Sequence, residues 1–202
     1  HMRFNVICPY CGSRERHRAY YLYWKKSNLF NGEKMKILHF APERAFYDKI
    51  SKIPFVDYYP VDINPMVYGV KEKVDITDIL YENDMFDVII CNHVLEHIPD
   101  EQKALAELKR VLKKGGKAFL NVPVFFKYKT TLEKAEYNTP EMRLKYYGQR
   151  DHVRAYGLDY EEHLKRVGFE VKMILINKNY SSEELDRFGL QSNEYIYECS
   201  KV

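Results

Sequence analysis

The stretch FDVIICNHVLEHIPDEQKALAELKRVLKKGGKAFLNVP, residues 86–123, decides the fold. Its first part completes an apolar segment, residues 85–91, of the kind that forms a buried strand. The next part predicts a helix over 100–114, because Asp100 is a favourable N-cap, apolar residues recur at helical spacing and lysines fill the last turn. A pair of glycines ends this helix, and residues 117–124 predict another strand. A strand, a helix and a strand in this order predict parallel pairing.

The same alternation continues on both sides of this stretch. Strands are predicted over 35–40, 55–63, 72–76, 169–176 and 194–202, and helices over 14–27, 43–51 and 159–169. We divide the chain into an N-terminal cysteine knuckle with a basic helix, residues 3–34, and one α/β domain, residues 35–202. Residues 125–157 interrupt the alternation with a polar, tyrosine-rich segment that is long for a connection. Long connections are typical of lids and binding loops.

Composition excludes several protein classes. The 202 residues are 46% hydrophobic and 30% charged, which indicates a globular chain. A net charge of +3 is too small to indicate nucleic acid as the partner. We find no apolar run that would serve as a membrane span or a signal peptide. The four cysteines do not resemble a disulfide framework, so we expect a cytoplasmic protein.

The residues that follow each strand are the candidates for ligand binding, because open α/β sheets bind ligands beyond the carboxyl ends of their strands. Asp62 ends the second strand, where a carboxylate can accept two hydrogen bonds from a ribose diol; the alternative is an Asp in a proline-flanked turn. Asp75 can accept from an adenine amine while Ile76 packs on the purine. The alternative for Asp75 is a cap for a helix over 78–82.

Residues of the central stretch resemble class I S-adenosylmethionine-dependent methyltransferases. The resemblance extends over roughly residues 36–124 and is carried by Phe86, Asp87, Val94, Leu95, Glu96, His97, Leu112, Gly115 and Gly116. The segments CPYCGSRERHR, ILHFAPE and YGQRDHVRAYG further resemble a bacterial, type 11-like subgroup that is found beside glycosyltransferases. The resemblance implies a Rossmann-like fold with helices on both faces of a mostly parallel, seven-stranded sheet whose last strand is antiparallel. It also implies S-adenosylmethionine as cofactor and S-adenosylhomocysteine as product.

The first motif departs from the family pattern. The family has an acid followed by three spaced glycines, whereas this chain reads His39-Phe40-Ala41-Pro42-Glu43. We expect this segment to lie along the methionine part of the cofactor, with Glu43 as a candidate substitute for the acid. The cofactor-binding residues implied by the resemblance are His39, Phe40, Ala41, Glu43, Asp62, Ile63, Asp75, Ile76, Asn92 and His93.

Two histidines are candidate general bases for an acceptor hydroxyl. His97 follows the fourth strand, and His152 lies in the inserted segment; a buried histidine bonded to a carbonyl is the alternative for each. The predicted acceptor-binding residues are Tyr146, Tyr147, Arg150, Asp151 and Arg154, together with His152. The same tyrosine-rich surface would also suit a homodimer contact.

Two patterns point toward metals, and we expect neither to bind one. His93 to His97 match the H-x-x-E-H pattern of inverted zinc peptidases, but Pro99 follows at once, so a helix carrying both histidines is not expected. Cys8 and Cys11 resemble one zinc knuckle. With His17 as the only further ligand nearby, they fall short of the four that a structural zinc site uses.

Three functions follow from these observations. The first is O-methylation of a small or glycan-linked acceptor, with polysaccharide biosynthesis as its context. The second is methylation of RNA or a nucleotide, favoured by the basic residues near the start. The third is a non-catalytic cofactor-binding scaffold, favoured by the altered first motif. The first explains the most features.

Overall fold

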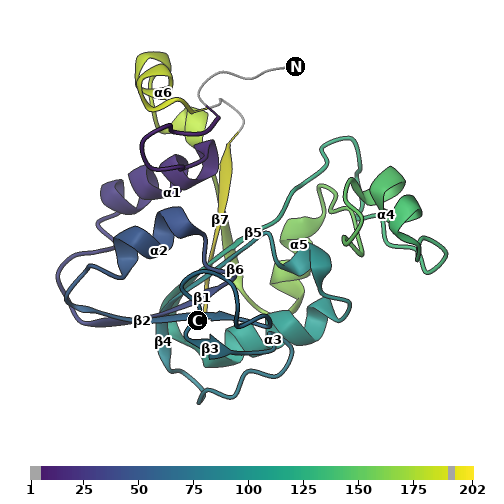
Figure 1. Cartoon of the computed structure of the whole chain (residues 1–202), viewed down its shortest axis with the longest axis horizontal. Helices are drawn as coiled ribbons and strands as arrows, with labels where there is room; N and C mark the ends of the chain where they lie inside the picture. Colours follow the sequence, from purple (N-terminus) through teal and green to yellow (C-terminus); the bar gives the residue numbers. More distant parts are fainter. Residues whose placement is uncertain (1–5, 191–193) are drawn as a thin grey trace.

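The computed structural model describes residues 6–190 and 194–202, and these build one mixed sheet with helices on both faces (Figure 1). Residues 3–5 of the predicted knuckle segment lie outside the described residues. The strands are β1 (Met35–Phe40), β2 (Val56–Asp62), β3 (Glu72–Lys73), β4 (Phe86–Asn92), β5 (Leu112–Asn121), β6 (Glu170–Leu175) and β7 (Tyr195–Ser200). The helices are α1 (Glu15–Lys26), α2 (Arg44–Ile50), α3 (Glu101–Val111), α4 (Pro140–Tyr147), α5 (Tyr160–Arg166) and α6 (Ser182–Phe188), with short 3-10 turns η1 (Leu95–His97) and η2 (Ile176–Lys178).

The strand order confirms the predicted fold class. The sheet runs β3-β2-β1-β4-β5-β7-β6, and the pairs from β3 to β5 are parallel. The last strand, β7, is antiparallel to both of its neighbours. The order reverses direction between β1 and β4, which is where such sheets bind their ligands.

Side chains alternate between the two faces of the sheet, and each face has its own core. In β4, Val88 and Ile90 pack with α1, α2 and α6, whereas Ile89 and Cys91 pack with α3 and α5. Tyr20 and Trp24 of α1 belong to the first of these cores. The basic N-terminal helix is therefore packed against the sheet and not held apart from it (Figure 1).

Two helices were not predicted, although both carry local signals. For α4, Thr139 is the N-cap, Pro140 is the first helical residue and Gly148 is left-handed at the C-terminal end. For α6, Ser181 and Glu184 form a capping box. Both helices are too short for their apolar pattern to be evident from the sequence.

Two predicted boundaries are wrong. The helix predicted over 100–114 ends at Val111, because Leu112 already pairs with Phe86 in the sheet. The strand predicted over 72–76 ends at Lys73. No helix is found at 78–82 either: Asp78 forms an isolated bridge with Asp75, and the residues that follow are irregular.

The inserted segment 125–157 is attached to the domain at its base and carries α4 outward from the sheet (Figure 1). Val124 forms a bridge with Tyr156, and Leu132 forms one with Ala155. The returning chain then passes η1, where the Val153 N–H donates to the Glu96 carbonyl at 2.9 Å. Among the helices of the described residues, none is long and apolar enough to cross a membrane.

Candidate functional site

A pocket of about 460 Å³ lies beyond the carboxyl ends of β1, β2 and β4. Its walls come from the strand ends, from residues after β3 and from η1. They include seven of the ten residues predicted to bind the cofactor: Phe40, Ala41, Asp62, Ile63, Asp75, Ile76 and His93. The tertiary structure therefore brings most of the predicted set together in one concave site of a size that suits a small molecule.

Two carboxylates face this pocket from neighbouring strand ends. The Asn64 N–H donates to Oδ1 of Asp62 at 2.7 Å, and the backbone and hydroxyl of Thr77 both donate to Oδ1 of Asp75 at 2.8 Å. The bonds from Thr77 lower the pKa of Asp75, so this carboxylate is ionised at neutral pH. Each bond uses Oδ1, which leaves Oδ2 of either residue for a ligand.

Two non-glycine residues in the pocket have left-handed backbone. Ala41 has a φ of 48° and His93 a φ of 55°. Ala41 stands where the family has a glycine, and its N–H donates to the Val61 carbonyl at 3.0 Å. The chain thus keeps the turn that glycine would favour, and the Cβ of Ala41 adds strain.

His39, Glu43 and Asn92 are absent from the pocket lining, contrary to our expectation. His39 is fully buried, 2.6 Å from the Tyr58 hydroxyl and 3.0 Å from Glu43. It lies on the opposite side of β1 from Phe40, because consecutive residues of a strand point to opposite faces. Asn92 is also buried, and its Oδ1 accepts from the Tyr20 hydroxyl at 2.9 Å.

Glu43 is the centre of a buried polar cluster against α1 that the sequence did not reveal. His17 lies 3.7 Å from it and Arg16 lies 4.0 Å from it. Burial tends to raise the pKa of Glu43, but the bond and charge of His39 with the charges of His17 and Arg16 hold it below its usual value. Burial also lowers the pKa of His17 to about 4. Glu43 is therefore occupied by contacts inside the protein and does not take the place of the family's acid in the pocket.

A second pocket, of about 380 Å³, meets the first at His93. Its lining includes Arg14 and Arg16 from the region of α1, Asn121 at the end of β5, and Tyr195 at the start of β7. Its position at a strand end makes Asn121 a candidate for ligand binding from the sequence, but no sequence signal indicates that Tyr195 would line a pocket. Two adjoining pockets that share one residue can place two ligands in contact.

The two candidate bases lie side by side. The rings of His97 and His152 are 4.7 Å apart and perpendicular. His97 lines the first pocket, and its Nδ1 is 3.2 Å from Oδ2 of Asp151. His152 is buried behind it, with Nδ1 at 3.2 Å from the Tyr147 carbonyl, and burial lowers its pKa. His97 is therefore the candidate base that reaches the pocket.

Arg154, predicted to contact the acceptor, instead holds η1 in place. Its side chain is buried, and its guanidinium donates to the carbonyls of Leu95, Ile98 and Pro99 at 2.6–2.9 Å. Two more bonds go to the Glu133 carboxylate. With all these donors engaged inside the protein, Arg154 has a structural role.

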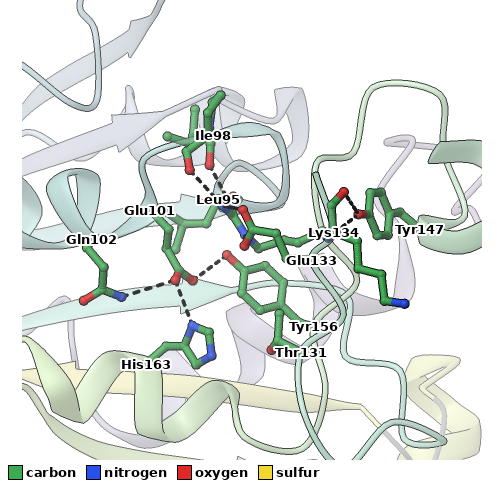
Figure 2. A network of polar contacts seen from close by, with 12 residues as sticks. Leu95, Ile98, Glu101, Gln102, Thr131, Glu133, Lys134, Tyr147, Tyr156 and His163 are labelled. Carbon is green, nitrogen blue, oxygen red and sulfur yellow. Dashed lines mark hydrogen bonds and ion pairs between the residues drawn. The ribbon is translucent and has the colours of Figure 1, made fainter. Parts of the chain in front are cut away.

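The other predicted acceptor residues lie outside both pocket linings. The Tyr147 hydroxyl bonds to the backbone of Lys134 (Figure 2), and Tyr146 stacks on Tyr137 at 3.9 Å. Arg150 forms an exposed pair with Glu141 at 2.9 Å. Asp151 faces the first pocket indirectly, because its Oδ2 lies 3.2 Å from Nδ1 of His97.

A buried network joins α3, α5 and the inserted segment (Figure 2). Glu101 accepts from the Tyr156 hydroxyl at 2.6 Å, and its other oxygen lies 2.8 Å from Nδ1 of His163. The bond to Glu101 raises the pKa of His163, which favours the charged imidazolium beside the carboxylate. Sequence reasoning missed this network because its members come from three separate segments.

The cysteine knuckle forms a tight turn. The Cys8 N–H donates to the Ser13 carbonyl at 2.8 Å, and the Cys11 thiol lies 3.2 Å from the Ser13 hydroxyl. His17 faces Glu43, and within the described chain these two cysteines belong to no group of three metal-ligating side chains.

Comparison with known proteins identifies the family. The model of a methyltransferase domain family matches residues 15–172. No curated protein matches the chain. A S-adenosylmethionine-dependent methyltransferase from Archaeoglobus fulgidus has 13% identity and a TM-score of 0.58, with 92% of this chain and 94% of that chain covered.

Two further solved structures share the fold. The [4+2]-cyclase SpnF has 13% identity and a TM-score of 0.57, covering 91% of this chain and 79% of that one. Phosphoethanolamine N-methyltransferase 2 from Haemonchus contortus, in complex with S-adenosylmethionine, has 15% identity and a TM-score of 0.54, covering 88% and 52%. At these identities the likeness concerns the fold, and the family match carries the assignment. The chain belongs to the methyltransferase domain family and has the class I, Rossmann-like fold of S-adenosylmethionine-dependent methyltransferases.

Proposed function

We propose that the chain binds S-adenosylmethionine in the first pocket and methylates a hydroxyl of a small or glycan-linked acceptor. One observation carries the cofactor assignment: Asp62 and Asp75 face one pocket from successive strand ends, beside the left-handed turn at Ala41. Asp62 would accept from the ribose hydroxyls. Asp75 would accept from the adenine amine, with Ile76 against the purine. The bound cofactor supplies an activated methyl group on a sulfonium.

The acceptor would enter the second pocket. His93 lines both pockets, so an acceptor there would lie next to the cofactor. Alignment of the two ligands and exclusion of water are the main contributions that methyl transfer needs from a protein. His97, whose Nδ1 faces Asp151, is the candidate to remove the proton of the hydroxyl.

The structure weakens the argument for an RNA acceptor, which rested on the basic residues near the N-terminus. The guanidinium of Arg18 donates to the carbonyls of Ser13, Phe188 and Gly189 at 2.6–2.8 Å, so it supports α6. Arg16 faces Glu43. Arg18 therefore serves the fold, whereas an RNA site needs its cations turned outward.

Calorimetric titration with S-adenosylhomocysteine tests the cofactor site. Asp62→Ala should weaken binding about 100-fold, because two hydrogen bonds to a charged acceptor contribute about 3 kcal/mol together. Asp57→Ala is the matched control. Asp57 lies near the other end of the same strand, away from the pocket, so this substitution should leave the affinity unchanged. Equal affinity of the Asp62 variant would place the cofactor elsewhere. No binding by the folded wild-type chain would favour a non-catalytic scaffold.

A screen with methyl-labelled S-adenosylmethionine tests the acceptor. Nucleotide sugars and glycans should accept label at a hydroxyl, and RNA should not. Label transferred to RNA would overturn the acceptor class while leaving the cofactor site intact.

A further inference from the structure

Three metal-ligating side chains meet beside the first pocket. Glu96, His97 and His152 each offer one ligand atom, and these atoms lie within 4.8 Å of one another. In residues 6–190 and 194–202 no other group of three or more such side chains is found. Glu96 and His97 come from η1 and His152 from the inserted segment, and the Val153 N–H bond to the Glu96 carbonyl holds the two segments together.

In each of the three side chains, a second polar atom is already engaged by the protein. Nδ1 of His152 lies 3.2 Å from the Tyr147 carbonyl, which fixes the proton on Nδ1 and leaves the lone pair on Nε2. Nδ1 of His97 lies 3.2 Å from Asp151, and Oε1 of Glu96 lies 3.3 Å from Nδ1 of His93. Metal-binding histidines have this arrangement, with one nitrogen oriented by a carbonyl or carboxylate and the other on the ion.

In two of the three side chains, the atom that remains is buried and has no partner. Oε2 of Glu96 and Nε2 of His152 are both inaccessible and make no hydrogen bond. The two side chains are 1% and 2% exposed. A buried carboxylate oxygen without a donor is unfavourable, and an Nε2 lone pair is an acceptor that cannot satisfy it. A cation between them would satisfy both.

We propose that Glu96, His97 and His152 bind one divalent transition-metal ion. Two imidazoles and one carboxylate favour ions such as Zn²⁺, Fe²⁺, Mn²⁺ or Co²⁺ over Mg²⁺ and Ca²⁺. Ligand atoms about 2.1 Å from an ion lie about 3–3.4 Å from one another, so binding draws the three side chains inward by about 1 Å. Three protein ligands leave coordination positions open, as in catalytic and not structural sites.

The ion would border the reaction centre, because His97 also lines the first pocket. This role rests on the proposed function. With the ion bound, His97 would be a ligand and would no longer act as the base. An acceptor hydroxyl at an open position would have a lowered pKa and lose its proton to solvent. Its oxygen would then form the bond to the methyl carbon as the carbon–sulfur bond breaks, with the electron pair remaining on sulfur.

Titration with Co²⁺, followed by visible absorption and calorimetry without cofactor, tests the site. The titration uses a chain with Cys8→Ser and Cys11→Ser, because thiolates bind Co²⁺ independently. We expect one equivalent to bind. Glu96→Gln and His152→Asn should each weaken binding at least tenfold. His163→Asn is the control: it alters a histidine that is paired with Glu101 and lies outside the proposed site, so it should not weaken binding.

Circular dichroism verifies that the variants fold, and His97→Ala supplies a third test at a partly exposed position. Absence of Co²⁺ binding by the parent chain, or equal binding by the Glu96 and His152 variants, would overturn the site. Binding of S-adenosylhomocysteine, measured separately, keeps this outcome distinct from failure of the proposed function.

Discussion

Arg154→Met should destabilise the protein by about 5 kcal/mol. The wild-type guanidinium makes three bonds of 2.6–2.9 Å to the carbonyls of Leu95, Ile98 and Pro99. A hydrogen bond to a charged group contributes about 1.5–3 kcal/mol, and we take the lower value because solvent can reach some of the vacated carbonyls. The pair with Glu133 adds under about 1 kcal/mol, since the Glu133 side chain is 50% exposed. Methionine retains much of the apolar stem, so packing changes little.

Chemical denaturation at neutral pH measures this loss, and thermal unfolding should show a decrease in Tm of about 15 °C. Arg150→Met is the matched control, because Arg150 lies in the same segment but forms an exposed pair with Glu141. Its effect should stay below about 0.5 kcal/mol. A free energy of unfolding for Arg154→Met within about 1 kcal/mol of wild type would refute the role of Arg154 as the support of η1.

Three other substitutions test separate parts of the structure. Tyr156→Phe removes the hydroxyl bond to buried Glu101 and should lower the free energy of unfolding by about 2 kcal/mol in denaturant titration. Ala41→Gly should raise Tm by a few degrees, because glycine adopts the φ of 48° without strain; an unchanged or lower Tm would contradict this. His17→Gln should reduce acid sensitivity. The folded pKa of about 4 lies below the unfolded value, so wild type loses up to about 3 kcal/mol as pH falls from about 6.5 to 4, and the variant should lack this slope in unfolding measured across that range.

Local sequence signals were sufficient for most of the fold. The predicted strand over 35–40 coincides with β1, and Asp100 caps α3 through the Lys103 N–H, as its residue type indicated. Asp62 and Asp75 follow from strand-end positions alone, because parallel strands end at one edge of the sheet. Periodicity, capping and strand order are properties of neighbouring residues, so a sequence can reveal them.

Long-range contacts decided the remaining features. His39 and Phe40 are adjacent in sequence, yet Phe40 lines the pocket while His39 bonds to Tyr58 and Glu43 behind it. Which face of a strand meets the ligand depends on what packs against the other face, and local periodicity does not specify this.

The sequence by itself determined the α/β class, the order of its elements and the two carboxylates that line the first pocket. Only the tertiary structure decided that Arg154 supports η1, and that His152 meets Glu96 and His97. These contacts join segments far apart in the chain. They depend on how the inserted segment returns to the sheet, which is set by the packing of the whole domain.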